Sequence, residues 1–155
     1  ILIYDKPGGE MIARFPMPRQ IREGSGYRSV ADYFPKAAEG GYSVLGVFAV
    51  VVEDLKEKEL DHKSFEYLLR HSICARLTDA LATWVQEQVA MGQHIIRPAF
   101  GYPACPAHEL KKTAFDLIKA PERLGVNLTE SYAVYPVTTI CGLLVAHPQA
   151  EYFGV

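Results

Sequence analysis

The residues best suited to chemistry gather in one stretch, RPAFGYPACP, at positions 97–106. Its three prolines exclude a helix interior or a central strand, because proline fixes φ and lacks a backbone N–H. Arg97 offers a planar fork of donors for a carboxylate, and Tyr102 offers a ring and a hydroxyl. Gly101 permits an unusual backbone angle or a close ligand. The stretch predicts either a site for a small zwitterionic or carboxylate-bearing ligand or a rigid structural loop with Arg97 in an ordinary salt bridge, and the residue types alone slightly favour the loop.

Signatures of other chemistries are missing from the sequence. It contains no GxSxG, GxGxxG, phosphate-binding P-loop or HExxH motif, and no two histidines lie four residues apart. Cys105 could be a nucleophile, but no base or helix N-terminus can be placed beside it, so a buried structural thiol is favoured. We therefore expect no catalytic residue and no metal site.

Composition narrows the partners and the compartment. A net charge of −2 disfavours nucleic acid as the main partner, since phosphate binding needs a basic surface. No apolar run approaches the roughly 18–20 residues that span a bilayer. The three cysteines are odd in number and form no CxxC pair, which favours reduced thiols. We predict a cytoplasmic protein with one domain over residues 1–155 and no membrane contact.

The element expected with most support is a long amphipathic helix over residues 61–89, with Gly92 as its stop. Its apolar residues recur every three or four positions, so we expect this side to face the core. The residues on that side are Phe65, Leu68, Leu69, Ile73, Leu77, Ala80, Leu81, Trp84 and Val85.

Strands are expected on both sides of this helix in the sequence. Residues 42–52 are almost wholly apolar and predict a strand covered on both faces, with a possible bulge at Gly46. Residues 128–136 and 138–148 predict two more strands that pair as a hairpin.

Shorter elements complete the expected order. Residues 108–120 predict a second helix with Ala114, Leu117 and Ile118 on its apolar face. The first twenty residues predict an extended segment, residues 24–26 a turn, residues 29–34 one helical turn and residues 53–59 a solvated connection. The order strand, helix, helix, strand, strand predicts an α+β fold with a twisted, mainly antiparallel sheet packed against the long helix.

The stretch RPAFGYPACPAHELKK closely resembles the signature RPAPGYPACPEHTEK of the activation domain of cobalamin-dependent methionine synthase. LTESYAVYP similarly resembles the family's LTESFAMWP, AHPQAEYF its SHPDSKYY, LGVFAV its IGAFAV, and ARLTDALATWVQEQV its RLAEAFAEYLHERV. These matches run in order from about residue 12 to the end. The resemblance implies a C-shaped α+β domain with a twisted antiparallel sheet, which binds S-adenosylmethionine.

The resemblance also implies which residues bind S-adenosylmethionine. Seven positions match the family's ligand-contacting positions: Asp79, Arg97, Ala99, Gly101, Tyr102, Tyr152 and Phe153. By this match Arg97 holds the ligand's carboxylate, Ala99 contributes a backbone contact, and the next residues continue the same binding strand. Tyr152 and Phe153 match a tandem aromatic pair, and Asp79 matches a glutamate on the long helix.

The sequence departs from the family pattern at four points. Asp79 is one methylene shorter than the family's glutamate, and Phe153 lacks the hydroxyl of the family's tyrosine. The family's N-terminal ligand-binding aspartate has no counterpart here, and the link between the long helix and Arg97 is shorter. We therefore expect a single activation-type domain that is incomplete at its N-terminus relative to the family.

The resemblance implies a reactivation module that supports reductive methylation of cob(II)alamin in methionine biosynthesis. No corrinoid-binding DxHxxG motif is present, so cobalamin would be held by a corrinoid-binding domain in the same or another chain. A flavodoxin-like reductant would supply the electron. The chain would then be an accessory part of a methyltransferase with no acid or base of its own. The alternative is a non-catalytic docking module for a corrinoid protein or a flavodoxin-like donor.

Overall fold

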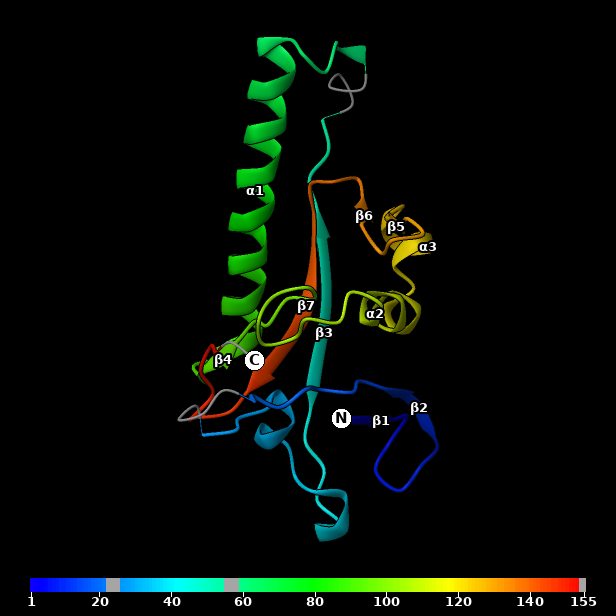
Figure 1. Ribbon diagram of the computed structural model, residues 1–155, viewed down its shortest axis with the longest axis vertical. Coiled ribbons are helices and arrows are strands. Elements are labelled where there is room, and N and C mark those ends of the chain that lie inside the picture. The colour runs from blue at the N-terminus through cyan, green and yellow to red at the C-terminus, as the bar shows by residue number, and fades with distance from the viewer. Residues whose placement is uncertain (22–25, 55–58, 154–155) are drawn as a thin grey trace.

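The computed structural model describes residues 1–21, 26–54 and 59–153, and its centre is a three-stranded antiparallel sheet (Figure 1). The strand order is β3 (Leu45–Val51), β7 (Thr139–Ala146), β4 (Ile95–Ile96), with β7 in the middle. The register between β3 and β7 is unbroken along the whole of β3. The predicted α+β fold, with an antiparallel sheet and one long helix, is confirmed.

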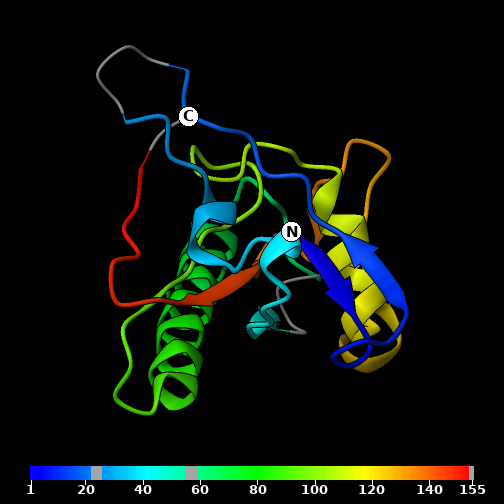
Figure 2. The ribbon, with the colours of Figure 1, turned by 90° about the horizontal axis from the view of Figure 1, so that it is seen from below.

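Helices cover the two faces of this sheet (Figure 2). The long helix α1 (Phe65–Ala90) lies on one face, and α2 (Leu110–Ile118) with α3 (Ala120–Leu124) lies on the other. Successive side chains of β7 point to opposite faces of the sheet. Leu143 and Val145 join the cluster under α2, whereas Leu144 joins the smaller cluster under α1. We call the α2 side the closed face and the α1 side the open face.

The closed face holds most of the buried core. Phe115 of α2 is 2% exposed, and Phe15 from the N-terminal segment is fully buried and stacked on Phe100, with ring centroids 6.1 Å apart. The predicted extended N-terminal segment is a hairpin of β1 (Leu2–Tyr4) and β2 (Met11–Arg14). Several segments distant in the sequence therefore pack together on this face.

Helix α1 forms where the apolar periodicity predicts it, but its buried side differs from the predicted one. The buried residues are Cys74, Thr78 and Ala82, whereas Leu77 and Trp84 on the expected core side are more than half exposed. The helix has apolar residues on more than one side. Leu81 and Val85, from the predicted side, pack with Ala82 against the sheet, whereas the other large apolar residues of that side remain exposed. Periodicity identifies an apolar side but cannot say which of two sides is covered.

The ends of α1 follow ordinary capping rules. The Ser64 side chain accepts a hydrogen bond from the Tyr67 N–H, which caps the first turn. Met91 and Gly92 both have positive φ, so the predicted stop at Gly92 is one residue beyond the C-cap.

The predicted hairpin of residues 128–136 with 138–148 is wrong. Strand β5 (Asn127–Leu128) turns back at once and pairs with β6 (Val134–Tyr135), while β7 pairs with β3 and β4. The turn forms because the Thr129 side chain accepts from the Ala133 N–H and Tyr132 takes a positive φ. The strand over β7 is confirmed.

Three smaller predictions are also resolved. Gly46 forms no bulge, because its pairing with Leu144 continues the register, and a Cβ there would lie 2.8 Å from the Leu144 side chain. The helical turn at residues 29–34 is the 3-10 helix η1 (Val30–Tyr33), and η2 (Ala37–Glu39) follows it. The turn at 24–26 and the connection at 53–59 fall partly outside the described residues.

The second predicted helix, 108–120, is divided in two. Lys119 takes a positive φ, which ends α2 and separates it from α3. Ala114 is buried as expected, while Leu117 and Ile118 are partly buried against the same cluster.

Candidate ligand site

The stretch at 97–106 begins as an extension of the edge strand β4. Ile96 pairs with Val145, and a bridge between Ala99 and Gly142 keeps the same register three residues later. The Leu143 N–H donates to the carbonyl oxygen of Pro98 over 3.0 Å. Pro98 lacks an N–H, which an edge position tolerates. The rigid backbone of this stretch is therefore held in place by β7.

This close approach depends on Gly142 in the middle of β7. A Cβ there would lie 2.8 Å from the Pro98 carbonyl oxygen and 3.2 Å from the Ala99 Cα. Sequence reasoning missed this residue. The signal was present, because a glycine inside an otherwise apolar strand indicates a bulge or a close backbone contact.

A tight turn follows the edge strand. Gly101 has a φ of +87°, and its N–H donates to the Cys105 carbonyl oxygen over 2.8 Å. A Cβ at Gly101 would overlap the ring of His108. The His108 Nδ1 lies 2.9 Å from the Lys111 Nζ, which also donates to the Tyr132 carbonyl oxygen. Glycine is thus required at position 101 by both its φ and its neighbour.

The Arg97 side chain points to the open face and meets α1. Its Nη2 lies 3.6 Å from the Asp79 Oδ1, and its guanidinium lies 5.8 Å from the centroid of the Phe48 ring on β3. The side chain is 18% exposed, whereas that of Asp79 is 59% exposed. The structure therefore brings together two residues that are eighteen positions apart in the sequence.

One nitrogen of the Arg97 guanidinium has no partner among the described residues. The Nη1 atom is buried and makes no hydrogen bond to them. A buried donor without an acceptor costs about 1–3 kcal/mol, more when the group is charged. An acceptor brought by a ligand would remove this cost.

The C-terminal segment lies along the outer edge of the same strand. The Arg97 backbone N–H donates to the Tyr152 hydroxyl over 2.8 Å, and the Tyr152 ring is 63% exposed. The His94 Nε2 lies 2.6 Å from the Ala150 carbonyl oxygen, which helps to hold this segment. Tyr152 is therefore beside Arg97.

Two of the seven predicted residues lie farther from the Arg97 guanidinium than Asp79 and Tyr152 do. Phe153 packs against the cluster of the closed face, away from the side on which the Arg97 guanidinium lies. Tyr102 sits on the turn beyond Gly101, with its side chain 67% exposed. Arg97, Asp79, Ala99 and Tyr152 thus form the compact part of the candidate site.

Cys105 is a buried structural thiol, as favoured by the sequence. It is fully buried, and this burial raises its pKa to about 11, with the nearby Glu109 carboxylate adding to the shift. A thiol of this pKa is almost wholly protonated at neutral pH, so it is a poor nucleophile.

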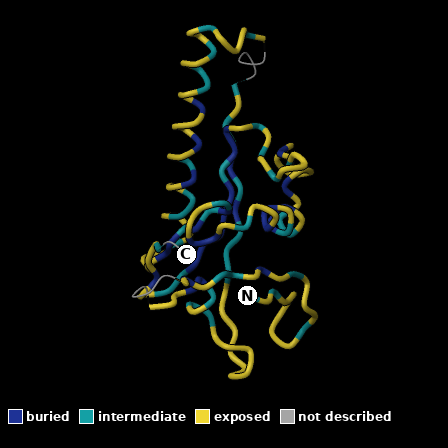
Figure 3. The backbone as a smooth tube through the Cα atoms, in the orientation of Figure 1, coloured by how far each residue is buried: buried dark blue, intermediate teal, exposed yellow. Residues whose placement is uncertain are grey.

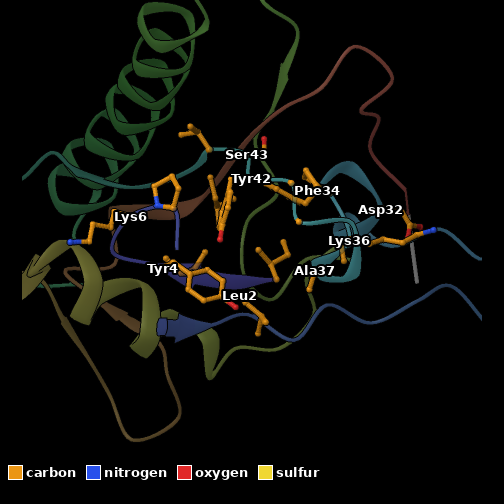
Figure 4. A pocket seen from close by; sticks show the side chains of 18 of the residues that line it. Leu2, Tyr4, Lys6, Asp32, Phe34, Lys36, Ala37, Tyr42 and Ser43 are labelled. Carbon is orange, nitrogen blue, oxygen red and sulfur yellow. The ribbon is translucent and has the colours of Figure 1, made fainter. Parts of the chain in front are cut away.

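A cavity of about 920 Å³ lies elsewhere, between β1 and the segment that precedes β3 (Figure 4). Leu2, Tyr4, Phe34 and Tyr42 line it, and no predicted site residue does.

Within the described ranges, no group of three or more His, Cys, Asp or Glu side chains could hold a metal ion. No helix in those ranges combines the length and apolar character needed to cross a bilayer.

Comparison with known proteins finds one matching family model and a solved structure of the same fold. Residues 93–155 match the family model of the vitamin B12 dependent methionine synthase activation domain. A crystal structure of the MetH reactivation domain bound to AdoHcy has the same fold, with a TM-score of 0.88 and 27% sequence identity. That match covers 99% of this chain and 55% of the other, so the chain spans about half the length of the matched structure. Residues 93–155 are therefore similar to the activation-domain family of vitamin B12 dependent methionine synthase, and nearly the whole chain has the fold of the MetH reactivation domain.

Proposed function

We propose that this chain binds S-adenosylmethionine and orients it for the reductive methylation of a cobalamin held by another domain or chain. The matched MetH reactivation domain binds AdoHcy, the product that remains when S-adenosylmethionine has given up its methyl group. The candidate site around Arg97 lies within the segment that matches the activation-domain family.

The observation that carries the proposal is the buried Arg97 Nη1 without a hydrogen-bond partner among the described residues. A ligand carboxylate would accept from this nitrogen in a charge-assisted hydrogen bond. Asp79 lies beside the same guanidinium, and it would attract the ammonium or sulfonium of the ligand. The opposite charges of these two side chains thus match the two charged ends of an amino-acid ligand.

The backbone between Arg97 and Gly101 supports this binding. It is fixed on one side by β7, and Ala99 lies on the open-face side of the edge strand. A preformed backbone loses little conformational freedom when a ligand binds. Ala99 is therefore the proposed backbone contact, with Gly101, Tyr102, Tyr152 and Phe153 as the further ligand-binding residues.

The chain's contribution to the reaction is orientation. S-adenosylmethionine supplies the methyl group, and no general acid or base is required from this chain. Holding two reactants in a productive geometry can be worth roughly 7–11 kcal/mol. The proposed partners are a corrinoid-binding domain, in the same or another chain, and a flavodoxin-like reductant, and the proposed compartment is the cytoplasm.

Calorimetric titration of the chain with S-adenosylmethionine tests the proposal directly. We expect saturable binding to the wild type. Arg97→Ala removes a charge-assisted contact worth about 1.5–3 kcal/mol, so binding should weaken about tenfold or more. Arg97→Lys keeps the charge but loses the fork, and it should recover only part of the affinity.

Arg123→Ala is the matched control, because Arg123 is exposed on α3 and lies on the closed-face side. Its affinity should equal that of the wild type. A folded wild-type chain that does not bind S-adenosylmethionine, or equal losses in both alanine variants, would contradict the proposal and favour the docking-module alternative.

A further inference from the structure

The C-terminal segment, residues 147–153, turns back beyond β7 and returns along the outer edge of β4. A hydrogen bond of 3.0 Å from the Ala150 N–H to the His147 carbonyl oxygen closes the turn, and the His147 N–H donates to the His94 carbonyl oxygen. Figure 3 shows that β7 is buried, whereas the segment beyond it is mostly exposed. Packing alone therefore fixes this segment less firmly than it fixes the sheet.

Side chains make further contacts between this segment and the edge strand. The His94 Nε2 lies 2.6 Å from the Ala150 carbonyl oxygen, and the Tyr152 hydroxyl accepts from the Arg97 N–H over 2.8 Å. The Tyr152 ring is more than half exposed, so few packing contacts hold it in place. Its position beside Arg97 therefore depends on how the backbone of the preceding residue, Glu151, is held.

Tyr33 holds that backbone from the N-terminal part of the chain. Its hydroxyl accepts a hydrogen bond of 3.2 Å from the Glu151 N–H, and its ring centroid lies 5.3 Å from that of His147. The Arg28 guanidinium pairs with the Glu151 carboxylate, but both side chains are at least half exposed. Exposed ion pairs contribute little, so Tyr33 makes the principal contact.

The 3-10 helix that carries Tyr33, η1, is itself firmly fixed. Val30 is fully buried, and the Ser29 N–H donates to the Asp32 carboxylate over 2.9 Å in a capping box. The Arg19 guanidinium donates to both oxygens of the same carboxylate, over 2.7 and 2.6 Å. The Tyr33 hydroxyl is therefore presented to the C-terminal segment from a rigid support.

We propose that Tyr33 is a positioning residue for the ligand site. Its hydroxyl fixes the backbone at Glu151 and thereby places the Tyr152 hydroxyl on the Arg97 N–H. Tyr33 thus acts on ligand affinity through Tyr152 without touching the ligand. This inference rests on the proposed S-adenosylmethionine binding and gives the helical turn at residues 29–34 a part in it.

Tyr33→Phe tests the role of the hydroxyl, because it keeps the ring that packs against the closed-face cluster. In the ligand-free chain, amide exchange followed by NMR should accelerate about two- to tenfold at Glu151 and about two- to threefold at Arg97. Calorimetric titration should show S-adenosylmethionine affinity about two- to fivefold lower than that of the wild type. Circular dichroism checks that the variant is folded.

The double variant Tyr33→Phe/Tyr152→Phe separates positioning from general stabilisation. If Tyr33 acts through the Tyr152 hydroxyl, Tyr33→Phe has no further effect on Arg97 exchange or on ligand affinity once that hydroxyl is gone. Two independent structural contributions would instead multiply. A multiplied effect in the double variant would overturn the inference.

Tyr42→Phe is the matched control, because the Tyr42 hydroxyl also accepts from a backbone N–H, that of Gly8, over 2.9 Å. It removes a hydrogen bond of the same kind beside the N-terminal hairpin. Exchange at Glu151 and Arg97 and the affinity for S-adenosylmethionine should all remain at their wild-type values.

The two measurements also distinguish this inference from the proposed function. Unchanged Arg97 exchange in Tyr33→Phe, or an equal change in Tyr42→Phe, would overturn the positioning role. A folded wild-type chain that does not bind S-adenosylmethionine would contradict the proposed function instead. The exchange rates at Arg97 would then still decide whether Tyr33 positions Tyr152.

Discussion

The two faces of the central sheet differ in how completely the chain covers them. On the closed face, α2, α3, the N-terminal hairpin and the turn at Phe100 enclose a large cluster with several fully buried side chains. On the open face, one helix packs Ala82, Leu81 and Val85 against a cluster of five buried residues among those described, and most of its large apolar residues remain exposed. The closed face therefore carries a large, well-buried hydrophobic core, whereas the open face carries a small one under a single helix.

The candidate ligand site draws on both faces of the sheet. The backbone of the site is fixed by β7, whose closed-face side chains are among the most buried in the chain. The charged pair Arg97 and Asp79 lies on the open face, where Asp79 remains more than half exposed. The chain therefore provides a rigid support on one side and a charged pair on the other, of which Asp79 is the accessible member.

The largest expected effect distinguishes the two faces by their stability. Leu143 is fully buried on the closed face, whereas Leu77 is 53% exposed on the open face. Leu143→Ala leaves a cavity and should lower the free energy of unfolding by about 3–5 kcal/mol. Leu77→Ala should change it by no more than about 0.5 kcal/mol. Urea denaturation of both variants measures the difference.

Should Leu143→Ala be too unstable to purify, Val145→Ala gives a smaller loss at a neighbouring, fully buried position. Equal losses for the Leu143→Ala and Leu77→Ala variants would show that the exposed side of α1 is covered in solution and would remove the contrast between the faces.

The second prediction uses the two thiols of the closed face. Burial raises the pKa of Cys105 and of Cys141 to about 11, from an ordinary value near 9. The folded state therefore keeps these protons in a pH range where the unfolded state releases them. Their contribution, up to roughly 2–3 kcal/mol for each thiol, is complete below pH 9 and is lost as pH rises toward 11.

Urea midpoints measured between pH 8 and pH 11 check this loss. Tyrosine and lysine groups titrate in the same range, so the Cys105→Ala/Cys141→Ala double variant is the reference. Its stability should fall less steeply with pH than that of the wild type, and parallel curves would refute the prediction.

Much of the fold was predictable because its signals are local. The apolar run of β3, the strand at β7 and the periodicity of α1 each specify an element within a few neighbouring residues. The orientation of α1 was not predictable, since apolar residues line two of its sides and only the packed structure selects Cys74, Thr78 and Ala82. The β5–β6 turn was missed because it depends on a Thr129 side-chain hydrogen bond rather than on glycine or proline.

The site was predictable in part. Arg97 and Gly101 were identified by residue type, and Asp79 was added by family resemblance. Gly142 and His108 were not identified, because each supports the site through a tertiary contact. Gly142 lies against Pro98 and Ala99, and the His108 ring lies against Gly101, and apolar periodicity reveals neither contact. Sequence motifs thus identified the proposed ligand-contacting groups more readily than the residues that support them.

The third prediction concerns this support. Gly142→Ala places a Cβ against the Pro98 carbonyl oxygen, and the backbone of the site must shift to relieve the contact. We expect a loss of about 1–3 kcal/mol in stability together with weaker S-adenosylmethionine binding. Gly125→Ala is the control, because Gly125 has a positive φ but nothing within 4 Å of an added Cβ. It should lower stability without changing ligand affinity.

The smallest expected effect concerns Tyr152, which joins the C-terminal segment to the site. Tyr152→Phe keeps the ring and removes the hydroxyl that accepts from the Arg97 N–H. The lost hydrogen bond is worth about 0.5–1.5 kcal/mol, and water can replace it at this exposed edge, so the lower part of the range is expected. Amide exchange at Arg97, followed by NMR, should accelerate about two- to tenfold. Tyr135→Phe, at a similarly exposed ring on β6, should leave that exchange unchanged. An unaltered exchange rate in Tyr152→Phe would mean that the C-terminal segment does not protect the edge strand in solution, and Tyr152 would then lose its place in the proposed site.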